Sequence, residues 1–138
     1  MITYSAENVK MPKIRKRDTS AWIKKVAASY GRKVGEIGYL FVDDERKFNP
    51  DVLKDDIVLI TCRTYSSAIE VLGYCRDNGW KAWVDLDHDL GEAKTGYDIC
   101  KFIVENQIPI LGYSLHTMNP VGRQNMNQLL SHYGYAQF

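Results

Sequence analysis

The chain has 138 residues, of which 45% are hydrophobic and 25% are charged, close to the average for globular proteins. This length fits one domain, and this composition excludes a disordered chain, a collagen-like repeat and a coiled coil. The formal net charge of +1 combines a basic beginning, net +6 over residues 1–36, with an acidic remainder, net −5 over residues 37–138.

The pattern of apolar and polar residues predicts strands that alternate with helices. Short, largely apolar runs predict strands at residues 1–4, 36–42, 57–62, 81–86 and 110–115. Apolar residues at helical spacing predict helices at 22–30, 66–78, 97–106 and 121–133. This alternation is typical of an α/β fold with a mostly parallel sheet and helices on both faces. We expect one compact domain, with a basic strand–helix extension at 1–36 and the main α/β unit at 37–138.

Targeting signals and cysteine usage indicate the compartment. The N-terminus has no apolar segment followed by a cleavage site, and no run of 18 apolar residues occurs, so we expect neither secretion nor a membrane span. Cys62, Cys75 and Cys100 are scattered and odd in number, which indicates reduced thiols in a cytoplasmic protein. The basic residues between positions 10 and 33 could contact RNA phosphates weakly, and the alternative is a solvated helix face.

Acidic residues and histidines follow three of the predicted strands. They are Asp43 and Asp44 after the first of the three, Asp87, His88 and Asp89 after the second, and His116 after the third. In a parallel sheet the ligand crevice lies outside the carboxyl ends of the strands. Carboxylates gathered there repel each other unless a cation lies among them, so we predict that Asp43, Asp44 and Asp87 hold Mg²⁺ or Mn²⁺. The alternative is a set of helix-capping and loop carboxylates without a metal.

The same edge offers groups for proton transfer and phosphate binding. We predict that His116 protonates a leaving oxygen, that Asp89 orients a water or a metal ligand, and that His88 is either a second proton carrier or a structural histidine. The predicted phosphate-binding residues are Arg46, Arg63, Thr117, Asn119, Arg123 and Asn125. Either of the first two arginines could instead pair with the surplus acids. No P-loop, dinucleotide-binding or nucleophile-elbow motif occurs in the sequence.

Five segments resemble the cyclic-phosphate processing receiver domain over about residues 40–133. They are FVDDER at 41–46, RT at 63–64, LDHDLG at 86–91, TGYD at 95–98 and HTMNPVGRQNM at 116–126. The resemblance implies a receiver-like (flavodoxin-like) three-layer sandwich, here with a truncated fifth unit. Response-regulator receivers carry a lysine after their last strand, where this chain offers His116.

The function that the resemblance implies is metal-assisted hydrolysis, or binding, of a cyclic phosphate on a nucleotide or an RNA end. Two alternatives stay open. One is a non-catalytic regulatory module that binds a phosphorylated ligand or partner. The other is a phosphoaccepting receiver with Asp87 as the acceptor.

Residues 1–44 resemble a different family, the start of the zinc-dependent endoribonuclease that matures bacterial rRNA. The matching segments are MITY at 1–4, KMP at 10–12, KRDTSAWIKKVAA at 16–28 and GEI at 35–37. The metal site of that family is a run of three histidines, and the histidines of this chain, at 88, 116 and 132, do not form one. The ribonuclease chemistry therefore does not transfer. We expect a bacterial gene fusion in which the extension covers the sheet edge exposed by the missing fifth unit.

Overall fold

The computed structural model describes residues 2–5, 37–49, 58–79 and 81–138. The predicted helix at 22–30 and the basic residues between 10 and 33 lie outside these ranges. Among the described residues, no helix combines the length and the hydrophobicity that a bilayer span requires.

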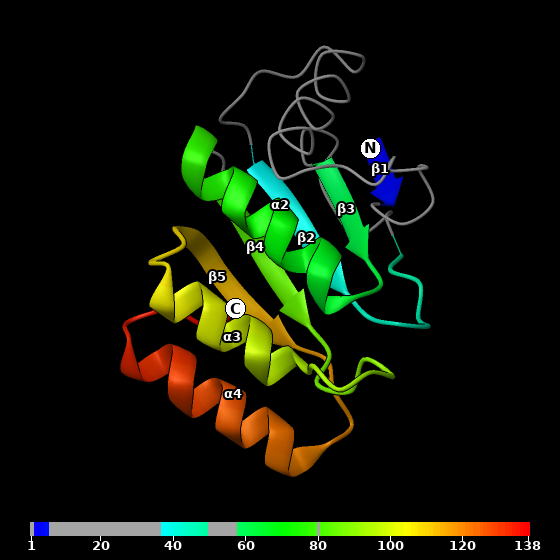
Figure 1. The fold of residues 1–138 in the computed structure, drawn as a ribbon, viewed down its shortest axis with the longest axis vertical. Coiled ribbons are helices and arrows are strands. Elements are labelled where there is room, and N and C mark those ends of the chain that lie inside the picture. The colour runs from blue at the N-terminus through cyan, green and yellow to red at the C-terminus, as the bar shows by residue number, and fades with distance from the viewer. Residues whose placement is uncertain (1, 6–36, 50–57, 80) are drawn as a thin grey trace.

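Five parallel strands form one sheet in the order β1-β3-β2-β4-β5. Their bounds are β1 Ile2–Ser5, β2 Ile37–Val42, β3 Val58–Cys62, β4 Lys81–Leu86 and β5 Ile110–Leu115. Each predicted strand is therefore confirmed to within one residue at either end. All five run in the same direction, so their carboxyl ends lie at one edge of the sheet, and the strand arrows point toward the lower right of Figure 1.

The two edges of the sheet are covered differently from the prediction. Strand β1 pairs with β3, in a register that runs from Ile2 opposite Val58 to Ser5 opposite Thr61. The described strand of the extension therefore does not cover the edge left by the missing fifth unit, because that edge is β5, on the opposite side of the sheet. The rest of the extension, residues 6–36, lies outside the described residues.

The end of the chain lies along β5 instead. The Tyr113 N–H donates to the Ala136 carbonyl at 2.9 Å, and the Phe138 N–H donates to the Tyr113 carbonyl at 2.9 Å. The ring of Phe138 packs edge-on against Trp83 at a centroid distance of 4.9 Å. These last residues satisfy edge groups that would otherwise invite pairing with another chain.

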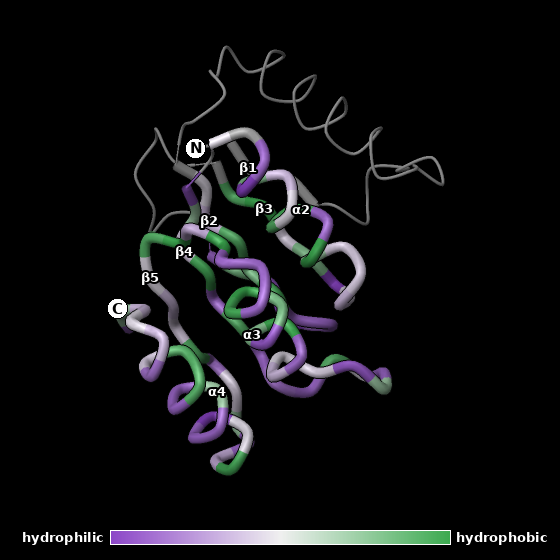
Figure 2. Tube along the Cα trace, turned by 60° about the vertical axis from the view of Figure 1, so that its left-hand side comes forward, coloured by the Kyte–Doolittle hydropathy of each residue, from purple (hydrophilic) through white to green (hydrophobic). Residues whose placement is uncertain are grey.

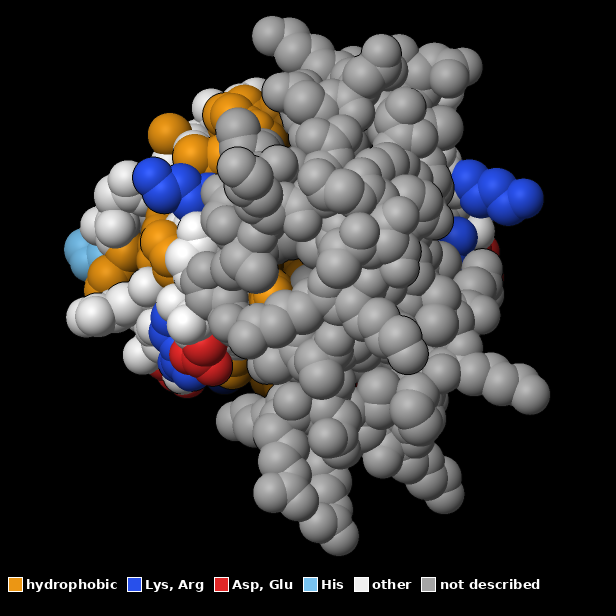
Figure 3. Space-filling view, turned by 90° about the horizontal axis from the view of Figure 1, so that it is seen from above, with side chains coloured by type: hydrophobic (Ala, Val, Ile, Leu, Met, Phe, Trp, Pro, Cys, Tyr) orange, Lys and Arg blue, Asp and Glu red, His pale blue; other side chains and the backbone are white. Residues whose placement is uncertain are grey.

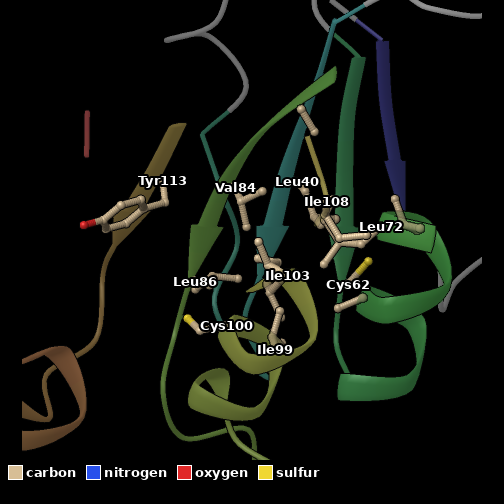
Figure 4. Close-up of a cluster of buried hydrophobic side chains, with 14 of the residues drawn as sticks. Leu40, Cys62, Leu72, Val84, Leu86, Ile99, Cys100, Ile103, Ile108 and Tyr113 are labelled. Carbon is tan, nitrogen blue, oxygen red and sulfur yellow. The ribbon is translucent and has the colours of Figure 1, made fainter. Parts of the chain in front are cut away.

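Three helices pack side by side against one face of the sheet (Figure 1). They are α2 Tyr65–Asn78, α3 Gly96–Glu105 and α4 Pro120–His132, which confirms the three predicted helices to within one residue. Between them and the sheet lies the main core, in which Leu40 and Val84 of the strands lie near Ile103 of α3 (Figure 4). The opposite face of the sheet carries a smaller cluster of Tyr39, Phe41 and Leu59. The described residues thus show two of the three predicted layers.

Side-chain caps fix where the helices begin. Thr64 precedes α2 and accepts from the Ser67 N–H at 3.1 Å, and Thr95 precedes α3 and accepts from the Tyr97 N–H at 3.2 Å. Asn119 precedes α4 and accepts from the Gly122 N–H at 2.9 Å. These oxygens satisfy N–H groups that have no partner within the helix. Each helix therefore starts directly after a strand-end loop, which holds those loops in place.

Hydropathy follows these layers. In α4 the tube alternates between polar and apolar segments, because one side of the helix is buried and the other is exposed (Figure 2). The view from above Figure 1 looks onto the end at which the strands begin, and its described surface mixes hydrophobic, basic and acidic side chains (Figure 3). The described residues visible on that face therefore do not form a patch of a single charge sign.

Candidate functional site

Three strand ends bring Asp43, Asp87 and His116 together. One possible ligand atom from each of the three lies within 4.8 Å of the others. The hydrogen-bond ladder continues one residue beyond the strands and aligns them: the Asp87 N–H donates to the Val42 carbonyl at 3.0 Å, and the His116 N–H donates to the Leu86 carbonyl at 3.1 Å. The three side chains are therefore held by a rigid sheet rather than by mobile loops.

Asp43 is the most buried of the three, with 1% of its surface exposed. Its Oδ1 accepts from the backbone N–H groups of Glu45 at 2.8 Å and Arg46 at 2.7 Å, and its Oδ2 lies 2.9 Å from Nε2 of His116. Burial by itself raises the pKa of Asp43, but these N–H groups and the imidazole outweigh burial and hold the pKa below its usual value. Asp43 is therefore an ionised carboxylate at neutral pH.

His116 lies between two carboxylates. Its Nδ1 is 2.5 Å from Oδ1 of Asp85, its Nε2 is 2.9 Å from Oδ2 of Asp43, and its ring stacks on Phe41 at a centroid distance of 4.7 Å. Burial lowers the pKa of His116, but Asp85 first and Asp43 second outweigh it and raise the pKa above its usual value. Because ionised carboxylates only accept hydrogen bonds, this geometry fits an imidazolium that donates from both ring nitrogens.

Asp85 is the residue at this site that the sequence analysis missed. It lies within β4 with 6% of its surface exposed, and its Oδ2 accepts from the Tyr39 hydroxyl at 2.6 Å. A signal was present in the sequence, since an aspartate inside an otherwise apolar strand must find partners when it is buried. By strand alternation Asp85 also lies on the same face as Asp87, two residues later.

The residues at this edge fit a divalent cation with a small adjustment. Two ligands on opposite sides of Mg²⁺ lie about 4.2 Å apart, since each bond is about 2.1 Å long, so the 4.8 Å group would have to close by some tenths of an ångström. Two carboxylates suit Mg²⁺ or Mn²⁺. His116 is the third member of the group, but an imidazolium has no free lone pair for a metal, so Asp43 and Asp87 would hold the ion. The predicted ligand Asp44 is not part of the group. The carboxylate of Asp44 instead lies near Gly91, 3.0 Å from where a Cβ atom would lie there.

Two arginines reach the same edge. Arg63 donates through one nitrogen to the carbonyl oxygens of Asp43, at 3.0 Å, and of Arg46. Arg46 donates to the carbonyl oxygen of His116 at 3.3 Å. Both guanidinium groups thus contact backbone carbonyl oxygens beside the acidic group, and phosphate binding by these two arginines stays a prediction.

His88 lies against the beginning of α4 and pairs with Asp89. Nδ1 of His88 is 3.0 Å from Oδ1 of Asp89 and 3.4 Å from the side-chain nitrogen of Asn119. The ring lies so close to Gly122 that a Cβ atom there would be 2.5 Å from two of its carbons. These contacts fit the alternative of a structural histidine that joins the loop after β4 to α4.

The remaining predicted ligands lie along the start of α4. Thr117 is buried, its hydroxyl accepts from the Asn119 N–H at 3.1 Å, and its carbonyl accepts from Arg123 at 2.5 Å. Arg123 and Thr117 line a shallow depression on the outer side of this loop. Asn125 lines a different depression, with Tyr97 and His132, so it does not join the residues at the strand ends.

The curated relatives of the chain are endoribonucleases. The chain is 44% identical over 77 residues to Endoribonuclease YbeY of Bacteroides thetaiotaomicron, an alignment that covers 54% of this chain and 50% of the relative. It is 42% identical over 96 residues to Endoribonuclease YbeY of Bacteroides fragilis strain YCH46, which covers 68% and 62%. The chain therefore spans between half and about three fifths of the length of these relatives. No solved structure matches the chain significantly.

A family model described as the Cyclic-phosphate processing Receiver domain matches residues 39–132. The alignment with the endoribonuclease of Bacteroides thetaiotaomicron spans 77 residues, more than the chain has outside residues 39–132. The region similar to the endoribonucleases and the region similar to the receiver domain therefore overlap. The match runs from within β2 to the end of α4, and it includes every strand end that contributes to the acidic site. The chain therefore belongs to the family of cyclic-phosphate processing receiver domains.

Proposed function

We propose that the chain hydrolyses a cyclic phosphate on a nucleotide or an RNA end, at the carboxyl ends of β2, β4 and β5. The observation that carries the proposal is the convergence of Asp43, Asp87 and His116 from three separate strands within 4.8 Å. The family description supports a cyclic phosphate. The printed name of the relatives, endoribonuclease, supports RNA as the source of that phosphate.

The acidic residues would hold a divalent ion. Asp43 and Asp87 are the two carboxylates that form a group with His116 within 4.8 Å. When bound, such an ion would stabilise negative charge on the phosphoryl oxygens. Asp43 would remain ionised for this role, because the N–H groups of Glu45 and Arg46 stabilise its charge.

His116 would supply the proton. Its Nε2 faces the acidic group, while its Nδ1 faces Asp85. As water adds to phosphorus and gives up one proton to the solvent, the ester bond to the ribose oxygen breaks, and that oxygen would take the proton from Nε2. A proton from the solvent would then restore His116 for the next turnover. The products are a phosphomonoester and a free hydroxyl.

Arg46 and Arg63 would bind the phosphate. A guanidinium group carries five N–H donors, and the contacts described above use one nitrogen of each arginine. The planar arrangement of these donors matches the oxygens of a phosphate. Both side chains are already held beside the acidic group by backbone carbonyls, which lowers the cost of ordering them.

Turnover of 2′,3′-cyclic nucleotides in the presence of Mg²⁺ or Mn²⁺ tests the proposal. We expect phosphomonoester product from the wild type and a fall of about 100-fold or more in kcat for His116→Gln and Asp87→Asn. Asn125→Ala is the matched control, since Asn125 lines a separate depression. Equal rates for His116→Gln and the wild type, or no product from the wild type with either ion, would contradict hydrolysis.

One observation favours a second candidate, a module that binds the phosphate without turnover. Both ring nitrogens of His116 already lie within hydrogen-bond distance of carboxylates, so a substrate reaches Nε2 only if Asp43 moves. Calorimetry with the same cyclic nucleotides separates the two functions. Binding that depends on Arg46 and Arg63, with no product after long incubation, would support the module.

A further inference from the structure

We propose that Asp85 is a positioning residue for His116, and that Tyr39 fixes the orientation of the Asp85 carboxylate. The contribution to turnover rests on the function proposed above, whereas the orientation of the ring does not. Asp85 touches neither the acidic group of Asp43 and Asp87 nor any residue predicted to bind phosphate. It acts through His116 alone.

The geometry gives each atom of the Asp85 carboxylate one partner. Oδ1 lies 2.5 Å from Nδ1 of His116, and Oδ2 accepts from the Tyr39 hydroxyl at 2.6 Å. All three residues are carried by strands or strand ends, on the sheet face opposite the helices. A buried carboxylate between a hydroxyl and an imidazole has little freedom to rotate, because each rotation would leave a polar group without a partner.

The Asp85 carboxylate determines which nitrogen of His116 serves the site. An ionised carboxylate only accepts, so Nδ1 carries a proton and Nε2 is the nitrogen that faces Asp43. The stacked ring of Phe41, 4.7 Å away and inclined by 19°, keeps the imidazole in this plane. The arrangement corresponds to the way in which a buried carboxylate orients a histidine in a hydrolase triad.

Tyr39 determines how the amide of Asp85→Asn would be oriented, and therefore whether Nδ1 of His116 can keep its proton. In Asp85→Asn the Tyr39 hydroxyl could accept from the amide nitrogen, but its own buried hydrogen would then lose its acceptor. We therefore expect the amide oxygen to face Tyr39 and the amide nitrogen to face Nδ1 of His116. An amide nitrogen donates, so Nδ1 must lose its proton. In the double variant Asp85→Asn with Tyr39→Phe the amide is free to turn, and its oxygen can accept from Nδ1 again.

Nitrogen NMR of the ring nitrogens at constant pH tests this directly and needs no substrate. The chain has three histidines, so His116→Gln identifies the signals of His116. We expect a protonated Nδ1 in the wild type and in Tyr39→Phe, an unprotonated Nδ1 in Asp85→Asn, and a protonated Nδ1 in the double variant. Tyr113→Phe is the matched control, because the Tyr113 hydroxyl bonds Asn127 at 2.5 Å and not this network.

Turnover of a 2′,3′-cyclic nucleotide gives the second readout. We expect Asp85→Asn to lower kcat at least about 100-fold with little change in KM, and the double variant to recover at least about tenfold of that loss. A merely structural role would not predict that a second substitution restores activity. If the wild type shows no turnover, the proposed function fails, while the NMR arm still decides the orientation.

Three results would overturn the inference. They are an unprotonated Nδ1 in the wild type, a protonated Nδ1 in Asp85→Asn with Tyr39 in place, and a double variant with the same spectrum as Asp85→Asn. The first needs no variant, so the inference stays falsifiable if Asp85→Asn does not fold.

Discussion

Gly96 couples the packing of α3 to the position of Asp87, and Gly96→Ala tests that coupling. A Cβ atom at residue 96 would lie 2.0 Å from the carbonyl oxygen of Asp87 and 3.0 Å from the sulfur of Met126. The oxygen belongs to the backbone, so it cannot turn away as the end of a flexible side chain can. An ordinary contact of carbon with a carbonyl oxygen is about 3.3 Å or longer, so the loop after β4 would have to move by more than about 1 Å.

The expected free-energy change follows from these contacts. Overpacking of this kind costs about 1–3 kcal/mol. The hydrogen bond from the Gly96 N–H to the His88 carbonyl, 2.7 Å long, would be distorted at a further cost of about 1 kcal/mol. Replacing glycine by alanine returns less than about 1 kcal/mol of helix propensity at the first residue of α3. We therefore expect Gly96→Ala to lower the free energy of unfolding by about 2–3 kcal/mol.

Urea unfolding, with Gly73→Ala as the matched control, measures this difference. Gly73 lies within α2, and a Cβ atom there meets nothing within 4 Å, so this variant should gain about 0.5–1 kcal/mol. With a slope of about 2 kcal/mol/M, the midpoints of the two variants should differ by about 1.5 M. A Gly96→Ala midpoint at or above that of the wild type would refute the reasoning. Because Asp87 moves with its carbonyl, the variant should also lose the cyclic-nucleotide turnover proposed above.

Three further predictions concern the network, the sheet edge and the thiols. The pKa of His116 is raised in the folded state, so its contacts stabilise the fold fully below about pH 6.5, and this stability should be lost as pH rises through the folded pKa. The pKa of Asp43 is lowered in the folded state, so its contribution to stability should be lost as pH falls below about 3.8. Urea titrations across pH should therefore show a decline on the alkaline side that is absent in His116→Gln. Deletion of residues 136–138 exposes β5 and should raise self-association measured by light scattering, whereas an intact monomer would contradict the role of these residues as an edge cover. Burial raises the pKa of Cys75 to about 12 and raises that of Cys100 as well, so both thiols should react with a disulfide reagent only after denaturation, and rapid labelling of the folded chain would contradict their burial.

The order of strands and helices from residue 37 onward could be predicted because local patterns determine it. Apolar runs such as 58–62 have no polar face and suit only a strand that is covered on both sides. Thr64, Thr95 and Asn119 are caps whose chemistry marks where a helix begins. The pairing of β1 could not be predicted, because nothing in its sequence distinguishes the β3 edge of the sheet from the β5 edge.

The site could be predicted only in part, because contacts between residues far apart in the sequence leave no local pattern. Asp43, Asp87 and His116 could be found because each follows a strand, and parallel strands end at one edge. Asp85 was hidden by its apolar neighbours in β4, and its partners Tyr39 and His116 are 46 and 31 residues away. Asn125 was assigned by its distance from the start of α4 alone, although it directly precedes the buried Met126 and therefore lies about 100° around the helix.

A histidine at the end of β5 explains how the acidic ends of β2 and β4 remain close together. The two N–H groups of an imidazolium point away from each other, so one ring reaches Asp85 of β4 at 2.5 Å and Asp43 after β2 at 2.9 Å. A lysine ammonium is a point charge on a flexible stem and would not connect the same two oxygens in one fixed plane. The positive charge of His116 offsets one carboxylate, while Asp43, Asp85 and Asp87 supply three. Arg46 and Arg63 donate to backbone carbonyls rather than to these carboxylates, so two negative charges remain among them. A divalent ion would neutralise these charges, so an ordered imidazolium and a bound cation are complementary parts of one site.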